Sequence, residues 1–233
     1  MSGTLYIIGT PIGNLGDITL RALETLKMVD AVYAEDTRVS GKLLARYEIK
    51  KPFYSFREAA PTGKVDFILR KIKESLEAGE NLAYLSDAGT PGVSDPGSYL
   101  VGQIAAAGYT VVPIPGPSAL ASLLSVGGLP TMRPLFVGFL PKKKGHQTLM
   151  QRLAKGLREE ICDGIVFYES PERICSLLQE IIDWKLPLQA VVGREMTKQF
   201  EEVMRGTPED LLNDLKARKS IKGEISLLIC HNP

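Results

Sequence analysis

Two carboxylates and an arginine, Glu35, Asp36 and Arg38, follow a short apolar run at 31–34 that predicts a strand. A carboxylate at a strand end can take a proton from a substrate hydroxyl, and an arginine beside it can orient that carboxylate or hold a phosphate. The same stretch also suits a helix start, with Asp36 or Thr37 as the cap of a helix from about Val39. Spacing alone leaves both interpretations open.

Three segments rich in glycine and proline each follow a predicted strand, at 9–16, at 86–97 (SDAGTPGVSDPG) and at 113–119 (PIPGPSA). The first has the spacing G-x-x-x-G-x-x-G, and Pro11 stands where a dinucleotide-binding turn needs its second glycine. Loops at the carboxyl ends of parallel strands meet at one edge of a sheet. Together these stiff loops predict a preformed pocket for a small ligand, whereas each loop alone also suits an ordinary turn.

Several other chemistries lack their residues. The chain has two histidines and three cysteines without a C-x-x-C, so we expect no metal site and no disulfide framework. GPSAL at 116–120 lacks the final glycine of a nucleophile elbow, and no lysine follows a glycine loop as in a P-loop. Neither a membrane span nor a signal-peptide pattern is present, which predicts a cytoplasmic protein.

Strand and helix patterns alternate along all 233 residues, which predicts an α/β protein. The segment at 127–134, with Gly127, Gly128, Pro130 and Pro134, is a plausible linker. We expect two α/β domains, 1–117 with a mainly parallel sheet and 118–233 with a mixed sheet. The predicted strands are 5–9, 31–34, 81–86, 111–114, 135–138, 164–168, 190–193, 200–205 and 225–229, and the predicted helices are 19–28, 39–47, 64–78, 98–107, 119–126, 147–158, 171–183 and 208–216.

The net charge of +1 argues against a strong, purely electrostatic attraction to nucleic acid. Charge is unevenly distributed, however, because no Asp or Glu occurs between Pro96 and Arg158. That window contains Arg133, Lys142, Lys143, Lys144, Arg152, Lys155 and Arg158. It predicts either a basic contact surface or a solvated lysine-rich loop.

Eight strings resemble, in order and spacing, the tetrapyrrole methylase superfamily, and the resemblance covers nearly the whole chain. They are GTLYIIGTPIGNLGDIT, AEDTR, LSDAGTPGVSDPG, IPGPSA, FVGFLP, FYESPERI, GREMTK and KGEISLLI. The likeness is greatest to the branch that methylates the ribose 2′-hydroxyl of a cytidine in small-subunit ribosomal RNA. It implies two α/β domains, S-adenosylmethionine (SAM) in a cleft between them, and a homodimer.

The resemblance also implies which residues contact SAM, and the chemistry and charge of the sequence supply the catalytic and RNA-binding candidates. Glu35, Asp36 and Arg38 are the catalytic candidates, with Glu169 and Glu195 as rival acids, and no metal is required. The residues expected to contact SAM are Ile12, Leu85, Ser86, Asp87, Thr90, Ser118, Ala119, Glu169 and Met196. Those expected to contact RNA are Lys142, Lys143 and Lys144, followed by Arg152 and Arg158 and with Lys198 as a further candidate.

The chain departs from the family pattern in two places. Relatives commonly carry histidines where this chain reads YSFREAAP at 54–61, and many extend into a small third C-terminal domain, which we expect to be absent here. Two alternatives to an RNA methyltransferase stay open at this point. One is methylation of a tetrapyrrole or a protein side chain, and the other is ligand binding without turnover.

Overall fold

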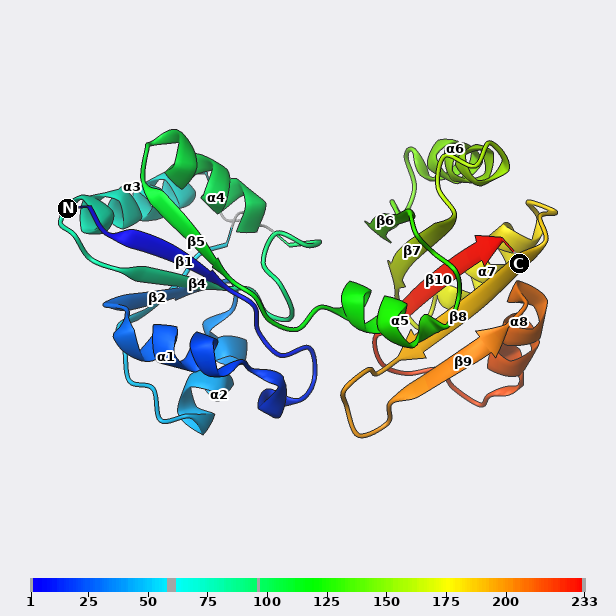
Figure 1. Ribbon diagram of the computed structural model, residues 1–233, viewed down its shortest axis with the longest axis horizontal. Helices are drawn as coiled ribbons and strands as arrows, with labels where there is room; N and C mark the ends of the chain where they lie inside the picture. Colours follow the sequence, from blue (N-terminus) through cyan, green and yellow to red (C-terminus); the bar gives the residue numbers. More distant parts are fainter. Residues whose placement is uncertain (1, 58–61, 96, 232–233) are drawn as a thin grey trace. The chain divides into compact units, whose positions relative to one another are not determined.

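The computed structural model describes residues 2–57, 62–95 and 97–231 (Figure 1). The chain divides into two compact units, Met1–Ser118 and Ala119–Pro233, each built around one five-stranded sheet. The first sheet is parallel and the second is mixed. The α/β fold class predicted from the sequence is therefore confirmed, while the end of the YSFREAAP stretch, 58–61, lies outside the described residues.

The first unit has the strand order β3-β2-β4-β1-β5. Two of its central strands, β2 and β4, are buried along their whole length, as expected for parallel strands covered on both faces. Its strands are β1 (Thr4–Ile8), β2 (Ala31–Ala34), β3 (Phe53–Ser55), β4 (Leu82–Leu85) and β5 (Thr110–Ile114). Its helices are the short 3-10 helix η1 (Leu15–Asp17), α1 (Leu20–Met28), α2 (Thr37–Arg46), α3 (Thr62–Glu77) and α4 (Gly97–Ala106).

Two of the connections in this sheet leave neighbouring strands toward opposite faces. Figure 1 shows α1 and α2 on one face and α3 and α4 on the other. The chain leaves β1 through α1 and leaves β4 through α4, and β1 and β4 are paired neighbours. Loops after two such strands diverge, and this is where open α/β sheets bind ligands. The topology therefore places a candidate site at the carboxyl ends of β1 and β4.

The second unit has the strand order β6-β7-β10-β8-β9, in which only β6 and β7 run parallel among the described pairings. Alternate residues of its strands enter two apolar clusters: Ile165 and Phe167 pack on one face, and Val166 packs with Leu123 of α5 on the other. Its strands are β6 (Pro134–Phe139), β7 (Gly164–Glu169), β8 (Leu188–Arg194), β9 (Glu202–Gly206) and β10 (Ile225–His231). Its helices are α5 (Ala119–Gly127), α6 (His146–Arg158), α7 (Ile174–Ile182) and α8 (Pro208–Ala217).

Helix boundaries follow local capping. Thr19 caps α1 by accepting the N–H of Ala22, and Thr207 and Asp210 form a reciprocal capping box at α8. Helix α7 begins at Ile174, three residues later than the sequence pattern predicts, because the preceding residues form a turn. Within the described ranges, no helix is long and apolar enough to span a membrane.

Candidate functional site

Hydrogen bonds join the three glycine- and proline-rich loops of the first unit. Thr10 and Gly89 exchange both main-chain bonds, with N–H···O distances of 2.8 and 3.1 Å. The Thr10 hydroxyl lies 3.3 Å from the carbonyl oxygens of Ser86 and Gly89, and Thr90 donates its hydroxyl to the carbonyl of Pro117 at 3.1 Å. The loops after β1, β4 and β5 therefore form one cross-linked structure, as their place at the strand ends predicts.

The loops after β1 and β5 also make direct backbone contact. A methyl group placed on Gly9 would lie 2.7 Å from the N and Cα atoms of Gly116. One placed on Gly116 would lie 2.6 Å from the Gly9 carbonyl oxygen. Such distances are far below an ordinary van der Waals contact, so both positions need glycine for close approach.

The AEDTR stretch lies against the loop after β4. The Asp36 N–H donates to Oδ1 of Asp87 at 2.9 Å, and the Glu35 N–H donates to the Leu85 carbonyl at 3.1 Å. Residues 35 and 36 thus continue the pairing of β2 with β4 beyond the strands. The structure therefore brings the catalytic candidates beside Asp87, which is one of the cofactor-contact candidates.

Asp36 is engaged in local structure. Its carboxylate caps α2 by accepting the Arg38 N–H at 2.8 Å, and it pairs with the guanidinium of Arg38 at 2.5 Å and with that of Arg57 at 2.9 Å. These hydrogen bonds, those from Arg38 above all, hold the pKa of Asp36 far below its usual range. A carboxylate so strongly stabilised in its charged form is a weak proton acceptor.

Glu35 has the opposite electrostatic setting. Partial burial and the neighbouring carboxylate of Asp87 raise its pKa above the ordinary value of 4.5, with a smaller contribution from Asp95, against the lowering effects of a main-chain hydrogen bond with Asp87 and of the charge of Arg57. The Glu35 main chain is held on both sides, since its carbonyl accepts Nε of Arg57 at 3.0 Å. Of the two adjacent acids, Glu35 therefore has the pKa closer to neutrality, which suits proton transfer.

The other cofactor-contact candidates of this unit differ in accessibility. The side chains of Leu85 and Ser86 are buried, so they can present only main-chain atoms to a ligand. Ile12 is also nearly buried, and it packs close to Gly89, where a methyl group would meet its Cγ2 at 3.4 Å. Asp87 and Thr90 are partly exposed.

Ser118 and Ala119 are partly exposed residues on either side of the division between the two units. Ala119 is also the first residue of α5. A contact through this pair would therefore come from the connecting segment.

In the second unit, Glu169 ends β7 as a buried carboxylate. Its Oε1 accepts the N–H of Ser170 at 2.7 Å, and its Oε2 pairs with Nη2 of Arg173 at 2.8 Å. Arg173 in turn lies 3.4 Å from the carbonyl oxygen of Leu140 after β6. Glu169 thus organises the strand-end turn and joins it to the neighbouring loop.

Met196, the remaining cofactor-contact candidate, lies in a strained turn after β8. Glu195 and Thr197 on either side of it both have positive φ angles, of 50° and 66°, which are uncommon for residues other than glycine. The Thr197 hydroxyl oxygen is buried without a hydrogen-bond partner among the residues described. The Met196 side chain packs into the apolar cluster beneath α5.

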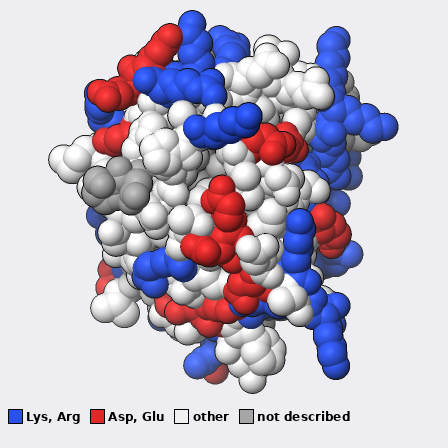
Figure 2. Space-filling model, turned by 90° about the vertical axis from the view of Figure 1, so that its right-hand side faces the viewer, with Lys and Arg blue, Asp and Glu red and all other residues white. Residues whose placement is uncertain are grey.

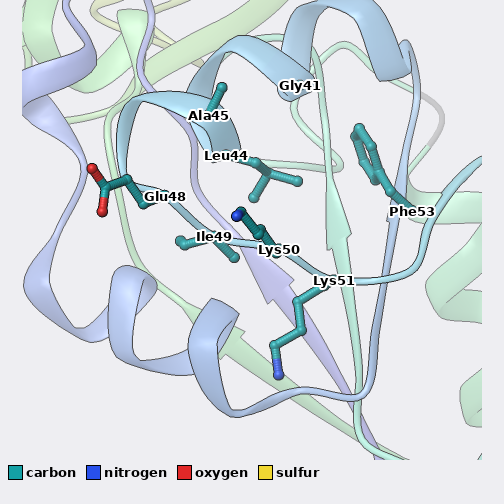
Figure 3. Close-up of a pocket in the computed structure, with 8 residues that line it drawn as sticks. All are labelled: Gly41, Leu44, Ala45, Glu48, Ile49, Lys50, Lys51 and Phe53. Carbon is teal, nitrogen blue, oxygen red and sulfur yellow. The ribbon is translucent and has the colours of Figure 1, made fainter.

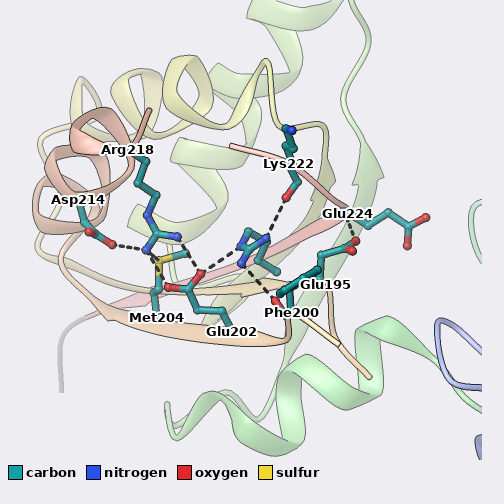
Figure 4. A network of polar contacts seen from close by, with 9 residues as sticks. Glu195, Phe200, Glu202, Met204, Asp214, Arg218, Lys222 and Glu224 are labelled. Carbon is teal, nitrogen blue, oxygen red and sulfur yellow. Dashed lines mark hydrogen bonds and ion pairs between the residues drawn. The ribbon is translucent and has the colours of Figure 1, made fainter. Parts of the chain in front are cut away.

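A polar network holds this turn in place (Figure 4). Arg194 donates to the carbonyls of Lys222 and Phe200 at 3.1 and 3.2 Å and to the Glu202 carboxylate at 3.0 Å. Oε1 of Glu195 accepts Nζ of Lys198 and the Glu224 N–H, both at 2.9 Å, and these bonds lower its pKa. Glu195 and Lys198 are therefore paired with each other, which leaves neither free for a substrate without breaking this ion pair.

Lys142, Lys143 and Lys144 are exposed in the loop between β6 and α6 and make no ion pair within the described part of the chain. Arg152 and Lys155 follow on the exposed side of α6. On the face shown in Figure 2, basic side chains gather along the upper and right-hand margins, and acidic ones interrupt them near the centre. This face is thus mixed, with local basic segments.

A hollow of about 770 Å³ lies elsewhere on the first unit (Figure 3). It is lined by the end of α2, by Lys50 and Lys51 in the following loop, and by Phe53 at the start of β3. Because α2 runs back from the carboxyl end of β2, this hollow is at the amino ends of the strands, opposite to the glycine-rich loops. No group of three metal-ligating side chains occurs among the described residues.

Some residues of these sites were not among the candidates that the sequence singled out. Arg57 follows a strand of only three residues, and its contact with Asp36 joins residues 21 positions apart, so no local pattern indicates it. Asp95 caps its own loop by accepting the N–H groups of Gly92 and Gly97, and the SDPG sequence is a signal for such a turn. The role of Arg194 depends on the turn that brings Phe200 and Glu202 back to it and on Lys222, which lies 28 positions away, so no local pattern indicates it.

Curated relatives cover nearly the whole chain. Ribosomal RNA small subunit methyltransferase I of Thermotoga maritima is 43% identical over 227 residues, which are 97% of this chain and 98% of that protein. The protein of the same name from Borrelia garinii subsp. bavariensis is 42% identical over 228 residues, 97% of each chain. That of Mesorhizobium japonicum is 43% identical over 98% of this chain and 75% of its own length.

Solved structures of lower identity share the fold. Uroporphyrin-III C-methyltransferase of Thermus thermophilus, complexed with S-adenosylhomocysteine, matches with a TM-score of 0.64 at 19% identity over 97% of both chains. Cobalt precorrin-4 methyltransferase matches with a TM-score of 0.62 at 20% identity over 99% of this chain and 96% of its own. The family model of tetrapyrrole (corrin/porphyrin) methylases matches residues 4–212. With its curated relatives and its fold in agreement, this chain belongs to the tetrapyrrole methylase family and is a methyltransferase that uses SAM.

Proposed function

We propose that the protein methylates the ribose 2′-hydroxyl of a cytidine in small-subunit ribosomal RNA. The observation that carries this proposal is the 43% identity, over almost the whole chain, to a ribosomal RNA small subunit methyltransferase. The choice of a cytidine 2′-hydroxyl rests on the sequence motifs and their resemblance to that branch of the family. A cytoplasmic location and a homodimer are parts of the same proposal.

The residues that we propose to contact SAM have suitable chemistry in each unit taken by itself. In the first unit, the partly exposed carboxylates of Asp87 and Glu35 can accept hydrogen bonds from hydroxyl or amino groups, and their negative charge suits a cation. In the second, the Thr197 hydroxyl beside Met196, which has no hydrogen-bond partner among the residues that the structure describes, offers a hydrogen bond to a ligand. Ile12, Asp87, Thr90, Ser118, Ala119, Glu169 and Met196 would hold SAM, with main-chain atoms of Leu85 and Ser86.

SAM supplies an activated methyl group on a sulfonium, so the protein needs neither a metal nor a covalent intermediate to activate the donor. What the chain contributes is the position of the acceptor and the removal of its proton. Holding the acceptor in line can contribute an effective molarity of about 10⁵ to 10⁸ M. A general base can add about 10² to 10⁴ in rate.

We assign the general base to Glu35 and a positioning role to Asp36. The raised pKa of Glu35 keeps it a better proton acceptor than Asp36, whose charge is neutralised by two arginines. Arg38 is bound to Asp36, yet its side chain is 83% exposed, so its free N–H groups can hold a phosphate of the RNA. Lys142, Lys143 and Lys144 are the second proposed RNA contact, because they are exposed and unpaired in the described structure.

The test has two parts. Calorimetry should show saturable binding of SAM, weakened strongly by Asp87→Ala and unchanged by Asp66→Ala, which removes an exposed carboxylate of α3. Transfer of tritiated methyl from SAM to small ribosomal subunits lacking the modification should yield 2′-O-methylcytidine after digestion to nucleosides. Glu35→Gln should slow transfer by about 10² to 10⁴ with little change in SAM affinity, while Glu77→Gln on α3 should leave the rate unchanged.

Three results would overturn the proposal. Saturable SAM binding without transfer to any RNA, or transfer to a tetrapyrrole instead, would exclude the RNA substrate. A methylated base in place of 2′-O-methylcytidine would exclude the proposed acceptor atom.

A further inference from the structure

Strand β6, at the edge of the second sheet, contains a bulge that redirects an aromatic side chain. The register with β7 shifts between Phe136 and Gly138, and Gly138 has a φ of 65°, in the left-handed region that favours glycine. Side chains alternate along a regular strand, so Phe136 and Phe139, three positions apart, would point to opposite faces. The bulge instead brings both rings to Tyr168 of β7.

The three rings form a compact group. The ring centroid of Tyr168 lies 5.0 Å from that of Phe136 and 5.7 Å from that of Phe139, with interplanar angles of 68° and 64°. The Tyr168 hydroxyl accepts the N–H of Leu120 in α5 at 3.0 Å, which fixes the orientation of the central ring. Edge-to-face contacts of this geometry hold aromatic rings in place.

Phe139 nevertheless remains 62% exposed. Phe136 is partly buried against the cluster beneath α5, so the group has one buried and one exposed end. If the bulge served core packing, the ring of Phe139 that it redirects would be buried. Here it presents a rigidly backed phenyl ring to the exterior, and bulges of this kind often re-aim a side chain beside a functional site.

The exposed ring and the three lysines belong to one anchored segment. Leu140, directly after Phe139, is buried, and its carbonyl oxygen lies 3.4 Å from both terminal nitrogens of Arg173. His146 closes the segment, with Nδ1 2.9 Å from the carbonyl oxygen of Pro141 and Nε2 2.7 Å from Oε2 of Glu180. Between these anchors stand Lys142, Lys143 and Lys144.

A fixed aromatic face beside exposed cations is the arrangement with which proteins bind unpaired nucleotides, because bases stack on the ring while the cations meet the backbone. We propose that Phe139, backed by Tyr168, is a stacking platform for an unpaired base of the RNA substrate, with the lysines of the same loop on the adjoining phosphates. This inference rests on the proposed function and adds to it a residue that recognises the base.

The test measures binding of fluorescently labelled, unmodified small ribosomal subunits to the full-length protein. Phe139→Ala should weaken binding about tenfold, and Phe139→Trp, which can still stack, should restore it. Phe67→Ala is the matched control, since this ring on α3 is also half exposed and lies near Arg70 and Lys71. It should bind as the wild type does.

Salt dependence separates stacking from charge. The slope of log affinity against log salt should be unchanged in Phe139→Ala, because no phosphate contact is lost. Replacing Lys142, Lys143 and Lys144 together by alanine should reduce that slope, by about 0.7 for each phosphate contact removed. SAM affinity by calorimetry and the mass by sedimentation should stay as in the wild type for Phe139→Ala.

Four outcomes would overturn the inference. Unchanged RNA binding by Phe139→Ala, while the wild type methylates the subunits, refutes the platform and leaves the proposed function standing. A changed oligomeric state would show that a second copy of the chain covers the ring, and a loss of SAM affinity would assign the ring to the cofactor. A wild type that binds SAM but neither binds nor methylates the subunits refutes both proposals.

Discussion

Replacing Gly9 by alanine tests the close approach of the loops after β1 and β5. Neither Gly9 nor Gly116 has a positive φ, so alanine meets no backbone strain at either position. The whole effect must come from the new methyl group, which would lie 2.7 Å from two main-chain atoms of Gly116. Carbon atoms in contact sit about 3.5–4.0 Å apart, so the loops would have to separate by about 1 Å.

The cost follows from what that separation disturbs. Overpacking of this kind costs about 1–3 kcal/mol. Moving Gly9 also stretches the bond from its N–H to the Ile114 carbonyl, now 3.0 Å, and one such bond contributes about 0.5–1.5 kcal/mol. We therefore expect Gly9→Ala to lower the free energy of unfolding by about 2–4 kcal/mol, and the melting temperature of the first unit by on the order of 10 °C.

Scanning calorimetry provides the measurement, and Gly102→Ala provides a control of opposite sign. Gly102 is exposed within α4, with open space where a methyl group would be, so alanine there should raise stability by about 0.5–1 kcal/mol. Gly9→Ala should also weaken SAM binding, because it displaces the loops that carry the proposed contacts. If Gly9→Ala melts at the wild-type temperature and binds SAM equally well, the inferred contact does not exist.

Three further predictions concern charged residues. The pKa of Glu35 is raised above 4.5 in the folded protein, so ionisation of Glu35 destabilises the fold as pH rises from the pKa of the unfolded chain through that of the folded protein. Urea unfolding should therefore show Glu35→Gln to be more stable than the wild type at pH 8 and equal to it at pH 4. A difference in stability that does not vary with pH would contradict this. Arg173→Ala leaves the buried carboxylate of Glu169 unpaired and should lower the free energy of unfolding by about 3–5 kcal/mol. The double variant Arg173→Ala with Glu169→Gln should recover part of that loss. Equal stability of the single and the double variant would speak against a buried ion pair. Hydrogen bonds from Arg218 and Arg194 lower the pKa of Glu202 to about 2, so the stability that its carboxylate contributes is present above about pH 4.5 and is lost as pH falls toward 2. Glu202→Gln should therefore be less stable than the wild type at pH 6 and equal to it near pH 2. Parallel curves of unfolding free energy against pH for the two proteins would refute the assignment.

Most of the fold could be predicted from local patterns. Strands such as β4, a buried apolar run bounded by polar residues and glycine, have a clear sequence signal. Strand β3 was missed because three residues cannot establish a period, and it forms by pairing with β2. The start of α7 was placed too early because Pro171 suits a first helical turn, whereas the chain forms a turn there around Glu169 and Arg173.

The candidate site could be predicted only in outline. Loop stiffness and strand-end positions indicate that the three loops gather at one edge, and the bonds of Thr10 and Thr90 join them there. The division of roles between Glu35 and Asp36 could not be predicted, because it depends on Arg57, Asp87 and Asp95, which lie 21 to 60 positions away along the chain. The bulge at Gly138 could not be predicted either, because a glycine in a strand can mark a bulge, a tight bend or the close approach of a ligand or another backbone segment.

The central position of β1 has a consequence for the order in which the chain is synthesised. Leu5 pairs with Leu82 on one side and with Val111 on the other, so one edge of this apolar strand stays open until β4 has emerged from the ribosome, and the other stays open until β5 has emerged, when about half of the protein has been made. Throughout that interval the emerging segment has unsatisfied backbone groups and can adhere to other nascent chains. Chaperone dependence of expression should therefore arise in the first unit, and a fragment ending before β5 should be captured by chaperones while one that includes β5 escapes them.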